Sequence, residues 1–68
     1  METREVIEDL LERNPGGLTI QELSNISHIS RYVIERIIAE LLGEGKIFIR
    51  KIGKAKLIYW SEYAKTNS

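Results

Sequence analysis

The strongest local signal in the sequence is the stretch Leu18-Thr19-Ile20-Gln21-Glu22-Leu23. Thr19 is a good helix N-cap, and Glu22 stands three residues later, where its side chain can bond back to the Thr19 backbone in a capping box. Leu18 and Leu23 occupy the positions of a hydrophobic staple, which fixes the angle at which the chain enters a helix. We therefore predict a helix that begins after Thr19. It is short, because the apolar periodicity breaks near Asn25 among several turn-forming residues.

One helix is predicted before this short helix and a longer one after it. From about Thr3 to Asn14, apolar residues recur at helical spacing, and Pro15 followed by two glycines ends the helix. Ser30 is a good N-cap for the longer helix, which runs to about Glu44 before a glycine supplies the C′ position. The buried stripe of this helix is predicted to be Ile34, Ile37, Ile38, Leu41 and Leu42.

After residue 45 the hydrophobic period changes from 3.6 residues to two. Residues 46–51 and 56–60 are rich in β-branched and aromatic side chains, and residues 52–55 can turn the chain, which together predict a β-hairpin. We expect Phe48, Tyr59 and Trp60 to complete the core under the hairpin, with base stacking on exposed rings as the alternative. The prediction is one domain over residues 1–61, followed by a short polar tail over residues 62–68.

The chain has 68 residues, and so small a domain folds alone only if nearly every apolar residue joins one core. The absence of cysteine excludes disulfides and thiolate metal sites, and no apolar run is long enough for a membrane helix. We therefore expect a cytoplasmic protein without membrane contact. The predicted core consists of Val6, Ile7, Leu10, Leu11, Leu23, Ile29, Ile34, Ile38, Leu41, Ile47 and Ile49.

The net charge of zero hides an uneven distribution. Residues 1–45 hold four basic and nine acidic side chains, whereas residues 46–68 hold six basic side chains and a single acidic one, Glu62. A basic element attached to an acidic body is the distribution expected when one surface faces a polyanion. The alternative is a solvated pair of strands that happens to be rich in lysine.

The order of these elements resembles a winged helix-turn-helix domain, and three short segments strengthen the resemblance. They are LTIQEL at residues 18–23, ISRYV at residues 29–33 and LLGEGKI at residues 41–47. This pattern is similar to that of small prokaryotic transcriptional regulators of the MarR, ArsR and Lrp types. The resemblance implies an α+β, mainly α fold of three helices and a two-stranded β-hairpin wing. It also implies binding to double-stranded DNA, with the third helix in the major groove and the wing on the adjacent backbone.

Ser30, Arg31, Tyr32 and Arg36 are the candidate DNA-binding residues at the start of the third helix. Arginine pairs with guanine edges and phosphates, and tyrosine hydroxyls and helix N-termini bind phosphate. Ser30 is at the same time the helix cap. For Arg36, the alternative is an ion pair with a glutamate, Glu35 or Glu40, on the same arc of the helix.

Arg50, Lys51, Lys54 and Lys56 surround the tip of the predicted hairpin, and the resemblance places them against the DNA backbone or the minor groove. Charged side chains also protect the edges of hairpins from aggregation, which is the alternative reading of the same residues. Glu35 and Glu40 are expected to oppose close approach of the third helix to phosphates.

His28 departs from the pattern, because these families usually have glycine in the turn between the second and third helices. Histidine tolerates the positive φ that this turn favours, and with no cysteine or carboxylate cluster beside it we interpret it as a turn residue rather than a metal ligand. No paired nucleophile and base or phosphate-binding loop is visible, so we expect neither an enzyme nor a cofactor.

Two functions compete at this point. One is a DNA-binding module, a small transcriptional regulator; the other is a winged-helix protein–protein interaction module of a larger assembly. Because regulators of this type usually occupy two half-sites, a homodimer is expected for the first function, formed through the first helix or the tail.

Overall fold

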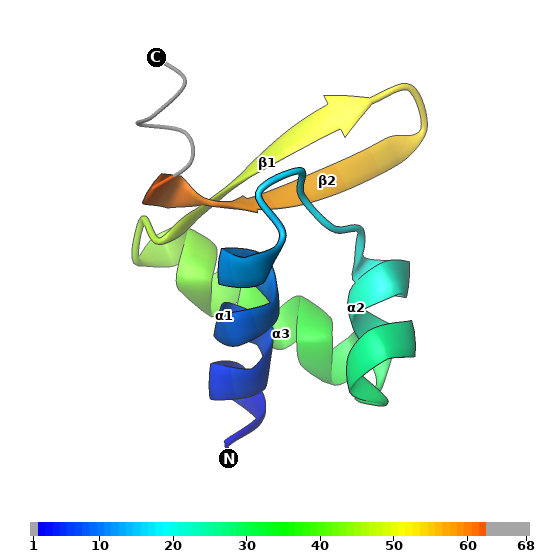
Figure 1. Cartoon of the computed structure of the whole chain (residues 1–68), viewed down its shortest axis with the longest axis vertical. Coiled ribbons are helices and arrows are strands. Elements are labelled where there is room, and N and C mark those ends of the chain that lie inside the picture. The colour runs from blue at the N-terminus through cyan, green and yellow to red at the C-terminus, as the bar shows by residue number, and fades with distance from the viewer. Residues whose placement is uncertain (1, 63–68) are drawn as a thin grey trace.

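The computed structural model describes residues 2–62 as three helices followed by a β-hairpin (Figure 1). The helices are α1 (Thr3–Arg13), α2 (Ile20–Ser27) and α3 (Arg31–Gly43), and the strands are β1 (Ile47–Ile52) and β2 (Ala55–Trp60). The hairpin lies across one end of the helices, and its tip extends beyond them on the side of α2. This is an α+β, mainly α architecture with winged-helix topology, as predicted. The rest of the predicted tail, residues 63–68, lies outside the described residues.

The capping box is confirmed at the start of α2. The Thr19 hydroxyl accepts from the Glu22 backbone N–H at 3.1 Å, and the Glu22 carboxylate accepts from the Thr19 backbone N–H at 2.9 Å. Leu18 and Leu23, the staple residues, are both buried. The start of α2 is therefore fixed by local hydrogen bonds and by the core together.

The turn from α2 to α3 is tighter than the sequence predicts. The helix continues to Ser27, whose hydroxyl bonds back to the Leu23 carbonyl at 2.6 Å, so the serines do not end it early. His28 then adopts the left-handed conformation, with φ 60° and ψ 27°, which confirms its interpretation as a turn residue. Only two residues, His28 and Ile29, separate α2 from the Ser30 cap of α3.

The C-terminus of α3 ends in a Schellman motif. Gly45 has a positive φ of 75°, and the backbone N–H groups of Gly45 and Lys46 donate to the carbonyls of Leu42 and Leu41. This motif turns the chain directly into β1. The two strands then pair antiparallel from Ile47 opposite Trp60 to Ile52 opposite Ala55.

One residue outside the hairpin, Leu18, pairs with strand β2. Leu18 forms an isolated antiparallel bridge with Ile58, through hydrogen bonds of 3.0 and 2.8 Å, so β2 lies between β1 and the loop before α2. Gly17 has no room for a side chain, because a Cβ there would lie 2.9 Å from the ring of Tyr59. The loop therefore holds the base of the hairpin close to the helices.

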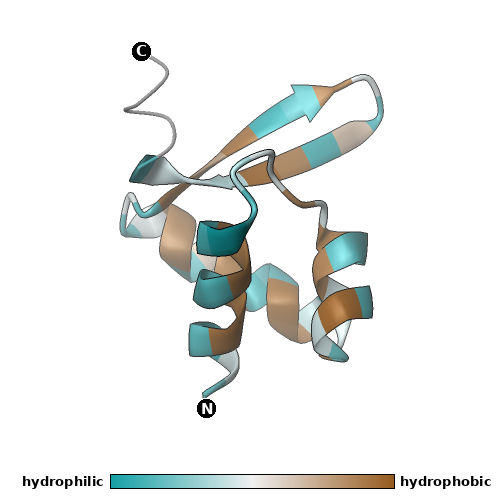
Figure 2. Ribbon diagram, viewed as in Figure 1, coloured by the Kyte–Doolittle hydropathy of each residue, from teal (hydrophilic) through white to brown (hydrophobic). Residues whose placement is uncertain are grey.

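One core joins all five elements, and in Figure 2 the hydrophobic segments of α1 and α2 face each other across it. Of the predicted core residues, most are buried, while Leu10 and Ile29 are partly buried against the core and Val6 is half-buried. Ile37, predicted in the buried stripe of α3, is buried as expected, and Leu18 and Ile58 are buried in addition. The buried residues are Ile7, Leu11, Leu18, Leu23, Ile34, Ile37, Ile38, Leu41, Ile47 and Ile58.

Two predictions about the core are wrong. Leu42 is 47% exposed, because it falls outside the arc of α3 that faces the other helices. Ile49 is 38% exposed, because it lies on the free edge of the sheet, whereas its partner Ile58 is covered by Leu18 on the other side.

The prediction that the three aromatic residues complete the core is correct only for Trp60, which packs against it. Phe48 and Tyr59 instead stack on the opposite face of the hairpin, with ring centroids 4.9 Å apart.

These burials predict different costs for two truncations in α3. Ile38→Ala should lower the free energy of unfolding by about 2–5 kcal/mol, since Ile38 is 4% exposed and its removal leaves a cavity. Leu42→Ala, four residues along the same helix, should cost less than about 1 kcal/mol. Urea or thermal unfolding followed by circular dichroism measures both. Equal losses for the two variants would contradict the core described above.

Candidate nucleic-acid interface

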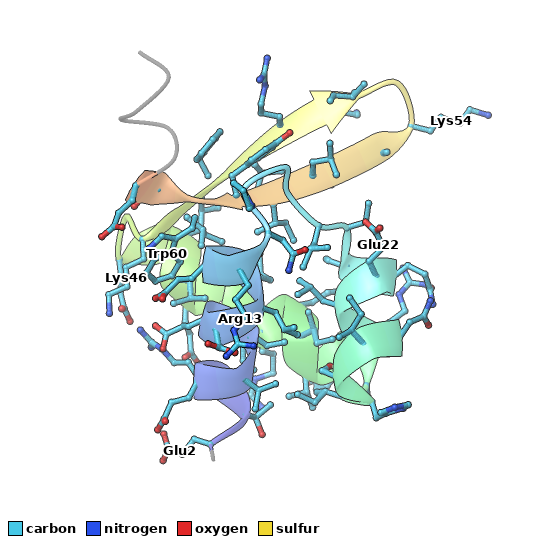
Figure 3. All side chains as sticks on the ribbon, viewed as in Figure 1. Glu2, Arg13, Glu22, Lys46, Lys54 and Trp60 are labelled. Atoms are coloured by element: carbon cyan, nitrogen blue, oxygen red, sulfur yellow. The ribbon has the colours of Figure 1, made fainter. Side chains whose placement is uncertain are left out.

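A groove of about 430 Å³ lies between the tip of the hairpin, the start of α2 and the first turns of α3. In Figure 3, Lys54 projects from the hairpin tip on the same side of the molecule as Glu22, which marks the start of α2. The groove thus brings together three separate parts of the chain, residues 19–21, 31–35 and 54–56. Its lining residues are Thr19, Ile20, Gln21, Arg31, Glu35, Lys54, Ala55 and Lys56.

The hairpin tip is built to present positive charge. A two-residue turn, Gly53 and Lys54, joins the strands, and the positive φ of Gly53 together with the ordinary φ of Lys54 fits a type II′ turn. Lys51 and Lys56 are directly opposed across the strands, although like charges in this position repel each other. An anion beside the two lysines would relieve this repulsion.

Arg50 is separated from these lysines. Neighbouring residues of a strand point to opposite faces, and Arg50 pairs with Leu57 on the face that carries Phe48 and Tyr59. Three of the four basic hairpin residues therefore belong to the inner face and the turn, whereas Arg50 belongs to the outer face.

The start of α3 presents its side chains in two directions. The Ser30 hydroxyl caps the helix by accepting from the Val33 backbone N–H at 3.3 Å, and the first residues after it, Arg31 and the 70% exposed Tyr32, stand free of the core. Arg31 lines the groove beside the hairpin. Arg36 instead lines a separate hollow of about 460 Å³ between α3 and the start of α1, which fits the angle of about 140° that five residues make around a helix.

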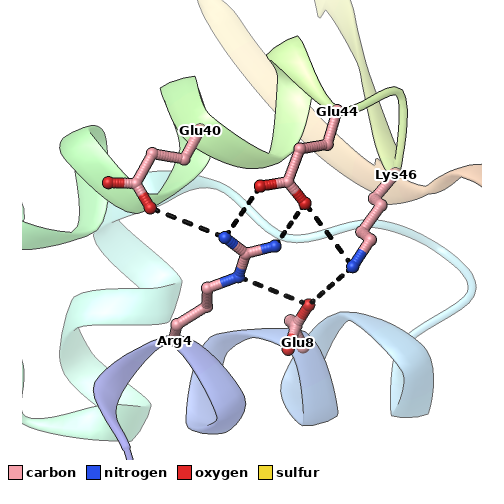
Figure 4. Close-up of polar contacts among 5 residues, drawn as sticks. All are labelled: Arg4, Glu8, Glu40, Glu44 and Lys46. Atoms are coloured by element: carbon pink, nitrogen blue, oxygen red, sulfur yellow. Dashed lines mark hydrogen bonds and ion pairs between the residues drawn. The ribbon is translucent and has the colours of Figure 1, made fainter.

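Two cations of the body, Arg4 and Lys46, are paired with carboxylates in a five-residue cluster (Figure 4). Arg4 donates to Glu44 through both terminal nitrogens, one of these hydrogen bonds measuring 2.9 Å, and lies 3.6 Å from Glu40 and 3.7 Å from Glu8. Lys46 lies 3.5 Å from Glu44 and 3.9 Å from Glu8. The cluster ties the first turn of α1 to the end of α3.

The cations of the groove and the hairpin are not paired. Within residues 2–62, the basic residues Arg4, Arg13 and Lys46 form ion pairs, and Lys65 lies beyond that range. The alternative for Arg36 is wrong, since it forms no ion pair there and Glu40 contacts Arg4 instead. The basic residues that form no ion pair in this range are Arg31, Arg36, Arg50, Lys51, Lys54 and Lys56.

The sequence gives no reason to separate Glu35 from Glu40, or to include the start of α2 in the site. Glu40 belongs to the Arg4 cluster, whereas Glu35 lines the basic groove together with residues Thr19 to Gln21. The spacing of Glu35, four residues after Arg31, was the available signal that both share one side of α3.

Comparison with known protein families, with curated proteins and with solved structures finds no match to this chain. In the described part of the chain, no group of three or more metal-ligating side chains comes together. No helix in that part has the length and apolar character needed to cross a membrane.

The Arg4 cluster predicts a specific acid dependence of stability. The hydrogen bonds from Arg4 hold the pKa of Glu44 below its ordinary value of 4.5. Because the folded pKa is lower than the unfolded one, the contribution is complete above pH 4.5 and is lost as the pH falls through the folded value. Glu44→Gln should therefore flatten the fall of the melting temperature below pH 4.5.

The control is Glu35→Gln, which removes a carboxylate that has no ion pair among residues 2–62 and should keep the full acid dependence. Melting curves between pH 7 and pH 2.5 compare the variants. An identical pH profile for Glu44→Gln and the wild type would show that the ion pairs of Glu44 contribute nothing to folding.

Proposed function

We propose that the protein is a DNA-binding module, a small transcriptional regulator, which places the start of α3 in the major groove and rests the hairpin on the adjacent backbone. The observation that carries the proposal is the division of the cations. Those of the body are neutralised by carboxylates, while the six at the start of α3 and in the hairpin are left for an external anion. Phosphates along a duplex are such an anion, and each phosphate neutralised releases counterions and strengthens binding.

The roles of the residues follow from where they stand. Lys51, Lys54 and Lys56 would contact phosphates from the inner face and turn of the hairpin. Arg31 and Tyr32, at the start of α3, would reach base edges and backbone, since the first residues of a recognition helix enter the major groove.

The remaining candidates have more restricted positions. The Ser30 hydroxyl is engaged with Val33, so the cap would hold the helix end toward the backbone. Arg50 and Arg36 would contact the duplex from outside the groove, Arg50 around the edge of β1 and Arg36 from the side of α1.

A protein-interaction module is the second candidate, and one observation favours it. The outer face of the hairpin carries Phe48, Leu57 and Tyr59, with Ile52 54% exposed near the tip, where a solvated sheet face is usually polar. A partner protein would cover this face and leave the groove free.

The homodimer expected from the resemblance remains a proposal as well. If the dimer formed through α1, two copies of a helix whose exposed surface is mostly acidic would face each other. The alternative contact, through the tail, lies outside the described residues.

Titration of a fluorescent duplex of mixed sequence at about 50 mM and about 200 mM salt tests the proposal. Lys56→Ala should weaken binding to every duplex and reduce the slope of log K against log salt by about one unit, since one phosphate contact is lost. Lys46→Ala, which removes the same charge from the Arg4 cluster on the body, should leave both quantities nearly unchanged.

If the wild-type domain binds no duplex at about 50 mM salt, the DNA-binding proposal fails and the interaction module takes its place. Equal effects of Lys56→Ala and Lys46→Ala would show binding through net charge alone, without the groove.

A further inference from the structure

Glu35 differs from every other carboxylate among residues 2–62. Glu2 and Glu5 stand at the start of α1, where the positive end of the helix dipole stabilises a negative charge. Glu35 is exposed in the second turn of α3, away from a helix end, and it has no hydrogen bond or ion pair in that range. The others all have a partner: Glu8, Asp9, Glu12, Glu22, Glu40, Glu44 and Glu62.

The surroundings of Glu35 make this isolation informative. It lines the groove together with Arg31, Lys54 and Lys56, so a negative charge stands in the most basic part of the surface. Arg31 is four residues earlier on the same side of the helix, at a spacing that allows an ion pair, yet the two do not pair within 4.0 Å. In a groove that only collected phosphates, a free carboxylate would weaken binding to every sequence.

A carboxylate accepts hydrogen bonds and donates none when it is ionised. In the major groove, phosphate and guanine offer it only acceptors. The N4 amino group of cytosine is a donor that carboxylates pair with, whereas the N6 amino group of adenine stands beside the N7 acceptor, which repels a carboxylate. The cost of bringing Glu35 to DNA is therefore offset at one kind of base.

We propose that Glu35 is a specificity-determining residue that accepts a hydrogen bond from the N4 amino group of a cytosine in the major groove. The inference rests on the proposed function and adds to it the base that the domain selects. Phosphate contacts by the groove lysines supply affinity for any duplex. Glu35 weakens binding to every site except those that place a cytosine within its reach. The domain therefore binds such sites in preference to others.

The helix geometry lets Arg31 and Glu35 act on neighbouring bases. Four residues of α3 rise about 6 Å along the helix axis, which is the length of roughly two base-pair steps. Arg31, with its bidentate donors, suits guanine O6 and N7, and Glu35 suits cytosine. The preferred site is then expected to contain a guanine and a cytosine within two base pairs of each other.

Selection from a pool of randomised duplexes, followed by anisotropy titrations of selected and mutated sites, tests the proposal with three variants. The wild type should prefer cytosine at one position by roughly 5- to 100-fold over other bases. Glu35→Gln should shift that preference to adenine, since a glutamine side chain pairs with adenine N6 and N7. Glu35→Ala should lose the preference and bind unrelated duplexes about two- to five-fold more tightly at low salt, because a repulsion of phosphates is removed.

Glu40→Gln is the matched control, because it removes the same charge from the same helix but outside the groove. It should keep the wild-type preference at every position. Melting curves confirm that each variant is folded, and all three substitutions are at exposed positions.

The outcomes distinguish the role of Glu35 from DNA binding itself. Binding by the wild type with an unchanged base preference in Glu35→Ala would overturn the role of Glu35 and leave DNA binding intact. A loss of the preference in Glu40→Gln as well would also overturn it, since charge on α3 and not position would be responsible. Absence of wild-type binding to any duplex would overturn both the function and the role of Glu35.

Discussion

Burial of one stripe of α3 is the interaction on which the rest of the structure depends. Ile34, Ile37, Ile38 and Leu41 supply four of the ten buried aliphatic residues, and α1, α2 and the hairpin all contribute to the same cluster. A chain of 68 residues has no second core with which to compensate. The stripe also sets the rotation of α3. This rotation decides that Arg31, Tyr32 and Glu35 are presented outward, with Arg31 and Glu35 beside the hairpin.

The surface has two parts that differ in whether their cations are paired with carboxylates. The Arg4 cluster holds three carboxylates, Glu8, Glu40 and Glu44, at the side where α1 meets the end of α3. Exposed ion pairs of this kind add little stability, but they neutralise the cations of the body. The net charge of zero is therefore the sum of an acidic body, whose own cations are paired with carboxylates, and a basic surface whose cations are not. This surface, with one carboxylate inside it, is what the proposed function uses.

The parts of the fold that the sequence predicts are those fixed by neighbouring residues. Each of these depends on residues within a few positions of one another. They are the Thr19 capping box, the left-handed conformation of His28, the Schellman motif at Gly45 and the change of hydrophobic period after it. The parts that it does not predict need contacts between distant residues. Arg4 meets Glu44 across forty positions, and the exposure of Ile49 depends on which strand is covered by Leu18.

The candidate site shows the same limit. The residue types and the basic hairpin are visible in the sequence, but strand register alone decides that Lys51 and Lys56 share a face and that Arg50 does not. In the same way, a helical spacing marks Arg31 and Glu35 as neighbours, while only the packing of the hairpin over α3 places Lys54 and Lys56 beside them.

In the proposed function, one side of the molecule, and not its overall charge, contacts DNA. The most direct measurement is the change in amide chemical shifts of the labelled domain as a short duplex is added at low salt. The proposed function predicts shifts concentrated at residues 19–21, 30–36 and 51–56, with the amides of Arg4, Glu8, Glu44 and Lys46 unchanged. Shifts centred on the Arg4 cluster or on the outer face of the hairpin, with none around the groove, would contradict it.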